Sequence, residues 1–174
     1  MELSPEERRE ALFEGHRRNP LTTTLQGGRF LSAFMLPLFG LLPPAGYGVI
    51  TTTGRRTGRR RRKCVRAMRQ GDKVFLVAIP GPEAGWLMNI EADPRVRLRI
   101  RGGNFAGVAR VLVDDEERRQ AREEFCGKVV ISDYGAFLLH RPGRPTADRI
   151  KDLLETWFRY GTPLVVDLSH TADG

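Results

Sequence analysis

Cysteine and histidine are scarce in this chain, and neither forms a metal-binding or disulfide pattern. Cys64 and Cys126 lie far apart, and no CxxC motif or Cys/His cluster accompanies them. We therefore predict no disulfide framework and no zinc site, and a reducing, cytoplasmic environment fits best. His16, His140 and His170 show no spacing for a metal or a catalytic triad, so we expect surface positions for them and no metal in the protein.

Long hydrophobic runs are also missing. The apolar stretch from Phe30 to Pro44 is shorter than the ~20 residues of a membrane-spanning helix, and Pro37 interrupts it. Three interpretations stay open: it covers an edge of the core, it contacts a membrane surface beside Arg17, Arg18 and Arg29, or it forms the roof of a lipophilic pocket. The charged start, MELSPEERRE, is not followed by a signal-peptide core, so secretion is not indicated.

Acidic and aromatic residues are absent from the segment Arg55 to Arg69, which holds nine Lys or Arg residues. Without a carboxylate nearby, these cations have no local partner, so we expect an anionic ligand there, with a solvated basic face as the alternative. Without an aromatic ring, the segment offers no stacking platform, which disfavours nucleic-acid binding. The formal net charge of +8 agrees with an acidic partner of some kind.

A hairpin is predicted around this basic segment. Val49, Ile50 and the threonines 51–53 are β-branched and favour an extended chain, after which Gly54 and Gly58 permit a tight turn. The chain then returns as a strand rich in arginine. The layout is that of an anion-binding turn between two strands.

The remaining pattern predicts mostly strands with helices around them. A helix starts at Pro5, with Ser4 and Glu7 as a capping box, and is expected to end near Arg18. Further elements are predicted from apolar periodicity: strands at Lys73–Ile79, Arg95–Arg101, Phe105–Val113 and Leu164–Leu168, a short helix around Trp86, and helices over residues 114–126 and 146–161.

This order predicts a small antiparallel barrel with peripheral helices, an α+β fold that is mainly β. The chain length suits one compact unit. We divide it into an N-terminal helix with the apolar segment, residues 1–44, and a barrel with helical insertions, residues 45–174.

Enough motifs now line up to suggest a family. The stretches VITTTGRRTGRRRR, KVFLVA and GWLMNIEADPRVRLRI resemble the deazaflavin-dependent nitroreductase family of the split β-barrel flavin-binding superfamily, over about 50 residues at the centre of the chain. The family's typical pattern is TTGRKSG, a basic strand, an apolar strand, WxxN and ANPxV. Here these motifs correspond to Thr52–Gly58, Arg59–Arg66, Val74–Ala78, Trp86 with Asn89, and Ala92–Val96.

The resemblance implies an oxidoreductase that uses coenzyme F-420, an 8-hydroxy-5-deazaflavin with a phosphodiester and an oligoglutamate tail, with FMN as a weaker alternative. Such a polyanion suits the basic strand. The cofactor contacts that the resemblance implies are Arg56, Thr57, Arg61, Cys64, Ala78, Ile79, Pro80, Trp86 and Asn89. Tyr134 resembles a late Asp-Tyr element on the substrate side and is the catalytic candidate, with Tyr160 as its alternative.

The implied reaction is hydride transfer from the reduced deazaflavin to a lipophilic quinone, enone or nitro compound. The alternative is a non-catalytic binder or carrier of a flavin-like or lipophilic ligand at a membrane surface. A peripheral membrane contact through Phe30 to Pro44 is compatible with either function. The sequence does not predict the oligomeric state.

Overall fold

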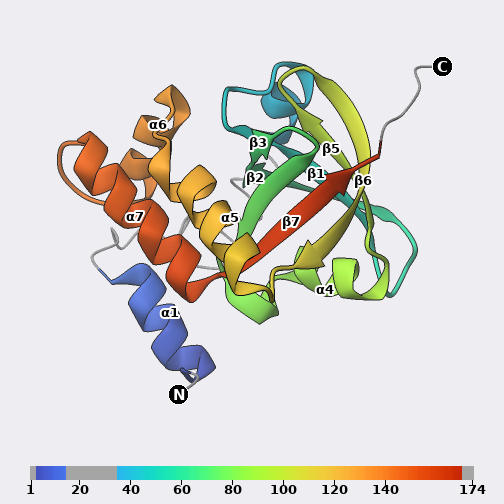
Figure 1. Ribbon diagram of the computed structural model, residues 1–174, viewed down its shortest axis with the longest axis horizontal. Coiled ribbons are helices and arrows are strands. Elements are labelled where there is room, and N and C mark those ends of the chain that lie inside the picture. Colours follow the sequence, from blue (N-terminus) through green and yellow to red (C-terminus); the bar gives the residue numbers. More distant parts are fainter. Residues whose placement is uncertain (1–2, 15–34, 170–174) are drawn as a thin grey trace.

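The computed structural model of the protein describes residues 3–14 and 35–169. A seven-stranded, fully antiparallel sheet forms its centre, with the strand order β2-β1-β5-β6-β7-β4-β3 (Figure 1). The strands are β1 Tyr47–Thr53, β2 Arg60–Arg66, β3 Met68–Gln70, β4 Lys73–Ala78, β5 Arg95–Ile100, β6 Gly103–Val111 and β7 Thr162–Leu168. The helices are α1 Pro5–Phe13, η1 Gly81–Glu83, α4 Gly85–Ala92, α5 Asp115–Gly127, α6 Ile131–His140 and α7 Ala147–Tyr160.

The sheet curls into a partly closed barrel because one stretch of chain reaches both of its edges. β2 and β3 stand at opposite ends of the strand order, yet only Ala67 separates them in the sequence. The Ala67 amide donates to the Gly46 carbonyl at 2.8 Å, on the β1 side of the bend. This closure confirms the predicted split antiparallel barrel.

The strand patterns of the sequence correspond to the burial in the sheet. In β5, Val96, Leu98 and Ile100 are buried while the arginines between them face outward, as the period-two alternation predicts. β4 lies inside the sheet between β7 and β3, and after its first residue every position is buried. The predicted strands near residues 49–53, 73–79, 95–101, 105–113 and 164–168 are all present.

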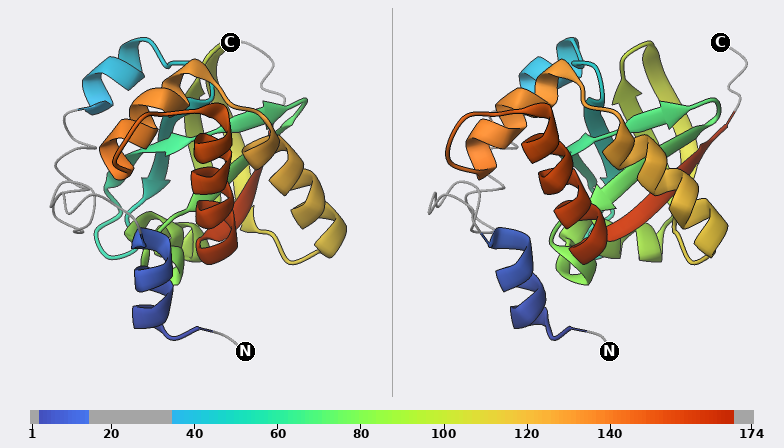
Figure 2. Two further views of the ribbon diagram at one scale, coloured as in Figure 1. Left: turned by 90° about the vertical axis from the view of Figure 1, so that its left-hand side faces the viewer. Right: turned by 60° about the vertical axis from the view of Figure 1, so that its left-hand side comes forward.

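Two apolar clusters stabilise the fold, one inside the barrel and one between the barrel and the helices. The interior cluster includes Ile50, Val65, Leu76, Leu87, Leu98 and Leu164. The second includes Leu12, Phe75, Phe125, Phe137, Leu154 and Trp157. Figures 1 and 2 show α1, α5, α6 and α7 gathered on one side of the sheet, where α6 meets the ends of β1 and β2 through Tyr47 and Arg66.

The helix ends follow the capping signals of the sequence. Ser4 accepts from the Glu7 amide at 3.2 Å and the Glu7 carboxylate accepts from the Ser4 amide at 2.8 Å, which is the predicted capping box. Helix α1 ends at Phe13, earlier than the predicted end near Arg18. Thr146 caps α7 and Gly161 ends it, both as predicted.

Helix α6 is the element that the sequence pattern did not predict. Its N-cap position is Val130, whose side chain cannot cap, and Gly135 interrupts its interior. It carries Tyr134. The last residue, His140, is half-buried with its ring 5.0 Å from that of Trp157, so the expected surface position is wrong for this histidine. His16 and His170 lie outside the described residues.

The described part of the apolar segment, residues 35–44, begins with a short helix over residues 35–41. Leu38, Leu41 and Leu42 are 60%, 79% and 76% exposed. Arg99 on β5 donates to the Gly40 and Leu41 carbonyls at 3.2 and 3.4 Å and so holds the helix end against the sheet. Residues 30–34 of the segment lie outside the described part, and none of the described helices is long and apolar enough to cross a membrane. The division at residue 44 stays a prediction.

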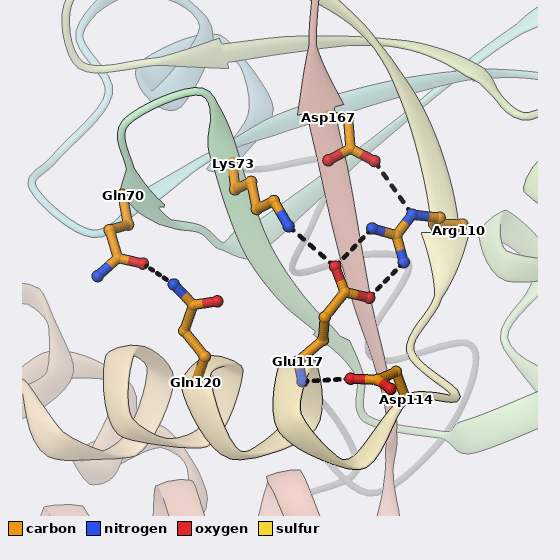
Figure 3. A network of polar contacts seen from close by, with 7 residues as sticks. All are labelled: Gln70, Lys73, Arg110, Asp114, Glu117, Gln120 and Asp167. Carbon is orange, nitrogen blue, oxygen red and sulfur yellow. Dashed lines mark hydrogen bonds and ion pairs between the residues drawn. The ribbon is translucent and has the colours of Figure 1, made fainter.

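A charged cluster joins α5 to the outer surface of the sheet (Figure 3). The Glu117 carboxylate accepts from Arg110 Nη1 and Nη2 at 2.6 and 2.7 Å and from Lys73 Nζ at 2.9 Å. Arg110 also pairs with Asp167 at 3.1 Å. These contacts hold the pKa of Glu117 at about 2, below its usual value of 4.5, with the Arg110 bonds as the largest cause and Lys73 next.

Candidate functional site

The β1–β2 turn is closed by its own backbone. The Gly54 amide donates to the Arg59 carbonyl at 2.8 Å, and the Gly58 amide donates to the Gly54 carbonyl at 2.7 Å. Gly58 has φ +65°, the left-handed region that favours glycine. A Cβ at Gly54 would stand 3.0 Å from the Arg59 carbonyl oxygen, a tight contact that favours a residue without a side chain. The two glycines of the motif thus produce the predicted turn.

Asn89 on α4 anchors this turn to the barrel. Its Oδ1 accepts from the Arg55 amide at 3.2 Å and from Arg55 Nη1 at 3.3 Å, and its Nδ2 donates to Thr52 Oγ1 at 3.2 Å. Asn89 is only 6% exposed. Both ends of its amide are therefore engaged within the protein, which makes it a positioning residue for the turn; a direct bond from Asn89 to a cofactor stays a prediction.

A group of exposed arginines on the turn and on the first half of β2 has no acidic partner. Throughout residues 3–14 and 35–169, the guanidinium groups of Arg56, Arg59, Arg60, Arg61 and Arg62 form no ion pair or hydrogen bond. Most other cations of the structure do have such contacts, as Arg110 and Arg119 illustrate. The unpaired charge of the basic segment is therefore concentrated at this one end of the hairpin.

Strand alternation sorts these arginines onto two faces. Thr52 opposes Arg61 in the sheet, and Thr52 lies on the same face as Ile50 of the barrel interior. Arg61 therefore extends from the inner face, beside the turn. Thr51 opposes Arg62, so that arginine stands on the outer face. We call the turn Gly54–Arg59 together with Arg61 the cradle.

Arg66, at the far end of β2, has a different role from the one its sequence position suggests. It is 5% exposed and forms a bidentate ion pair with Asp133 of α6, at 2.8 and 2.9 Å. It also donates to the Phe125 and Lys128 carbonyls at 2.5 and 2.7 Å. The basic run has no carboxylate near it in the sequence, as predicted, but Arg66 is neutralised by a carboxylate 67 residues away that folds against it.

The segment after β4 leads directly from the core to α4. Ala78 is fully buried inside the barrel, and Ile79 packs against the helix-side cluster. Pro80 precedes η1 and, as a proline, offers no amide donor. Trp86 on α4 is half-buried and packs against the interior cluster.

The predicted cofactor residues fall into groups. Arg56, Thr57 and Arg61 belong to the cradle, and the bonds of Asn89 bring the first turns of α4, which carry Trp86, to the same place. Cys64 is half-buried further along β2. Their contacts with a cofactor stay predictions.

Tyr134 is placed apart from the cradle. It lies on α6 and is 37% exposed. Figure 1 places α6 among the helices on one side and the β1–β2 turn beside α4 on the other. Its alternative, Tyr160, ends α7 and packs partly buried against the helix-side cluster, as a structural tyrosine would. The catalytic role of Tyr134 stays a prediction.

The described residues contain no group of three or more His, Cys, Asp or Glu side chains that could hold a metal ion. Cys126 is buried on α5, and burial raises the pKa of its thiol to about 12, which keeps it protonated at neutral pH. The cationic cradle is thus the feature of the structure that is best suited to a ligand, and that ligand would be anionic.

Comparison with known proteins identifies the family. Residues 39–136, more than half of the chain, match the F-420H(2)-dependent quinone reductase family. A search of curated proteins found no match.

Comparison with solved structures finds similar chains at low sequence identity. A domain-swapped dimer is 20% identical with a TM-score of 0.50, and the match covers 81% of this chain and 93% of that one. An F-420-H2-dependent reductase, FDR-A, is 20% identical with a TM-score of 0.48 over 71% and 95% of the two chains. The heme storage protein HutZ of Vibrio cholerae is 12% identical with a TM-score of 0.48 over 78% and 88%. The chain belongs to the F-420H(2)-dependent quinone reductase family and is an oxidoreductase whose cofactor is coenzyme F-420.

Proposed function

We propose that the protein transfers a hydride from reduced coenzyme F-420 to a lipophilic electrophile, with a quinone as the first choice and an enone or nitro compound as the other candidates. The observation that carries the proposal is the cradle, where Arg56 and Arg61 stand without an acidic partner in the described structure. A phosphodiester and an oligoglutamate tail are the complementary charges. Guanidinium groups bind both kinds of oxyanion in bidentate fashion.

The cradle is held in shape before any ligand binds. The bonds within the turn and the contacts of Asn89 with Arg55 and Thr52 fix the backbone, so little conformational entropy remains to be lost in forming the site. Thr57 adds a hydroxyl at the same turn. These residues bind and orient the anionic portion of the cofactor and leave the ring portion to the side where Trp86 lies.

When bound, the reduced deazaflavin supplies the hydride from its ring carbon. The protein has to orient the acceptor and stabilise the negative charge that develops on the acceptor oxygen. On the family resemblance of the Asp133-Tyr134 pair, we assign this second task to the Tyr134 hydroxyl, which lies on α6 away from the cradle and can donate a hydrogen bond to a carbonyl, quinone or nitro oxygen.

A fluorescence titration with oxidised coenzyme F-420 tests the cradle. We expect saturable binding by the wild type, loss of about 10- to 100-fold in affinity for Arg56→Ala/Arg61→Ala, and weak or no binding of FMN. The control Arg144→Ala/Arg159→Ala removes the same charge from a loop and from α7, and should bind as the wild type does. If the two double variants lose affinity equally, net charge rather than the cradle governs binding.

A turnover assay then separates a reductase from a carrier. Reduced coenzyme F-420 is mixed with a short-chain quinone, and its oxidation is followed by absorbance. We expect turnover by the wild type and, for Tyr134→Phe, a fall in kcat of about 100-fold with little change in KM. Binding of the cofactor without any turnover would favour the carrier, and an unchanged kcat in the tyrosine variant would remove Tyr134 from the site.

A further inference from the structure

A second group of arginines lies on the outer face of the barrel, away from the cradle. In the sheet register, Thr51 stands between Arg62 of β2 and Arg97 of β5, and Thr53 opposes Arg60. Side chains that oppose one another in antiparallel strands project from the same face. Because Val96 and Leu98, the neighbours of Arg97, point into the barrel, this face is the outer one. We call Arg60, Arg62 and Arg97 the outer arginine cluster.

The outer arginine cluster has no compensating charge in the structure. All of its members are exposed, and within residues 3–14 and 35–169 none of them forms an ion pair or a side-chain hydrogen bond. Neighbouring strands lie about 4.8 Å apart, so the backbones that carry Arg62 and Arg97 are separated by about 10 Å, a distance over which like charges still repel at about 0.1 M salt. The arrangement is unfavourable for the isolated protein and becomes favourable against an anionic surface.

Exposed leucines adjoin this cationic face. Arg99, two residues along β5 from Arg97, donates to the Gly40 and Leu41 carbonyls and holds the end of the helix over residues 35–41 against the sheet. Leu41 and Leu42, at that end, are 79% and 76% exposed. Large apolar side chains exposed beside unpaired cations match the two components of a bilayer surface, anionic headgroups and acyl chains.

We propose that the outer arginine cluster and the leucines at residues 38, 41 and 42 form a docking surface for an anionic lipid bilayer. Self-association fits the same face poorly, because a two-fold dimer centred on the cluster would bring the arginines of the two copies together. The phosphates of a nucleic acid would pair with the arginines, but they would leave the exposed leucines without an apolar partner. The surface lies on strands β1, β2 and β5, at positions where the three arginines are exposed.

Vesicle sedimentation tests the proposal without any turnover, so its result is independent of the proposed reductase activity. The wild type is mixed with phosphatidylcholine vesicles, with or without about 30% phosphatidylglycerol, at about 0.1 M and about 0.5 M salt. We expect binding only to the anionic vesicles, weaker at high salt. Because each basic residue near an anionic surface contributes about fivefold to partitioning, Arg62→Ser/Arg97→Ser should reduce it about 25-fold.

Matched variants separate the components. Arg144→Ser/Arg159→Ser changes the net charge equally on the helical side and should bind vesicles as the wild type does. Leu41→Ser/Leu42→Ser should reduce partitioning by about tenfold while all cations remain.

Four results would overturn the proposal. The first two are no binding of the wild type to anionic vesicles, and an equal loss of vesicle binding in both arginine variants. The other two are vesicle binding that is unchanged in Leu41→Ser/Leu42→Ser and is competed by duplex DNA, and a loss of coenzyme F-420 affinity in Arg62→Ser/Arg97→Ser. The last result would assign these arginines to the cofactor tail. Wild-type affinity for the cofactor in that variant, together with lost vesicle binding, supports a separate docking surface.

Discussion

Removal of one partner from the ion pair of Arg66 and Asp133 is expected to be among the most destabilising single changes in this protein. The Asp133 carboxylate accepts from Arg66 Nε and Nη2, from Tyr47 Oη at 2.9 Å and from the Val130 amide at 2.8 Å. The side chains of Arg66 and Asp133 are 3% and 1% exposed. The pair therefore connects the open end of the β1–β2 hairpin, opposite the turn, to the end of α5 and the start of α6.

Asp133→Ala leaves a guanidinium buried without its counter-ion. Arginine cannot shed its proton, and the Phe125 and Lys128 carbonyls can offset only part of its charge. Breaking a buried pair in this way costs about 3–5 kcal/mol. Because a domain has about 5–15 kcal/mol in total, the loss amounts to a large share of the free energy of unfolding.

Companion variants make the prediction sharper. Tyr47→Phe removes one hydrogen bond to a charged group and should cost about 1.5–3 kcal/mol. Arg66→Met/Asp133→Leu removes both charges together and should be less destabilised than Asp133→Ala, because no uncompensated charge remains.

Urea unfolding at equilibrium, followed by tryptophan fluorescence, measures these differences in the free energy of unfolding. A loss below about 1 kcal/mol for Asp133→Ala would refute the reasoning, since it would mean that water reaches Arg66 and that the pair is not buried in solution. A double variant that is less stable than the single one would show instead that the site tolerates a lone charge better than an apolar replacement.

Further predictions concern the surface cluster, the turn and two glycines. The pKa of Glu117 is lowered from 4.5 to about 2, so its contribution to stability is full above pH 4.5 and is lost as pH falls toward 2; in Glu117→Gln, the decline of the urea midpoint over that range should be shallower. Asn89→Ala should loosen the turn and weaken coenzyme F-420 binding in the fluorescence titration, whereas Asn89→Asp keeps the acceptor for Arg55 and should bind more tightly than the alanine variant. A Cβ on Gly161 would stand 2.6 Å from the Trp157 carbonyl oxygen, so Gly161→Ala should destabilise by about 1–3 kcal/mol, whereas Gly135→Ala meets nothing within 4 Å in a helix and should stabilise by up to about 1 kcal/mol; thermal unfolding compares the pair.

Local sequence signals predicted the parts of the fold that depend on local physics. The alternation in β5 reflects one buried face, and the caps at Ser4 and Thr146 satisfy amides within the same helix turn. Helix α6 escaped prediction because its start depends on Asp133, which accepts from the Val130 amide while it also binds Arg66. Asp133 caps the helix locally, but the N-cap residue itself is a valine, so the usual Ser, Thr, Asp or Asn signal at the N-cap is missing from the sequence.

The candidate site was likewise predictable where it depends on neighbouring residues in the sequence. The glycines and arginines of the turn are a contiguous motif, and the structure brings Asn89 to that turn. The partner of Arg66 lies 67 residues away along the chain, a separation over which a single sequence carries no pairing signal. For this reason the cradle could be located from the sequence, whereas the different roles of the arginines along β2 could not be predicted.

Strand geometry accounts for part of this difference in roles, because Arg61 and Arg62 project from opposite faces, whereas Arg62 and Arg66 share the outer face and differ because α6 folds against Arg66. Along β2, Arg61 lies on the inner face, Arg62 on the outer face and Arg66 in a buried ion pair, so one run of like residues serves three environments. A single ligand on one face of a strand cannot contact all of them. The excess charge of the chain is therefore a poor guide to the number of phosphate or carboxylate contacts, and the sheet register is a better one. For a basic strand in any barrel, we expect alternate positions to bind different partners unless both faces are enclosed by the same ligand.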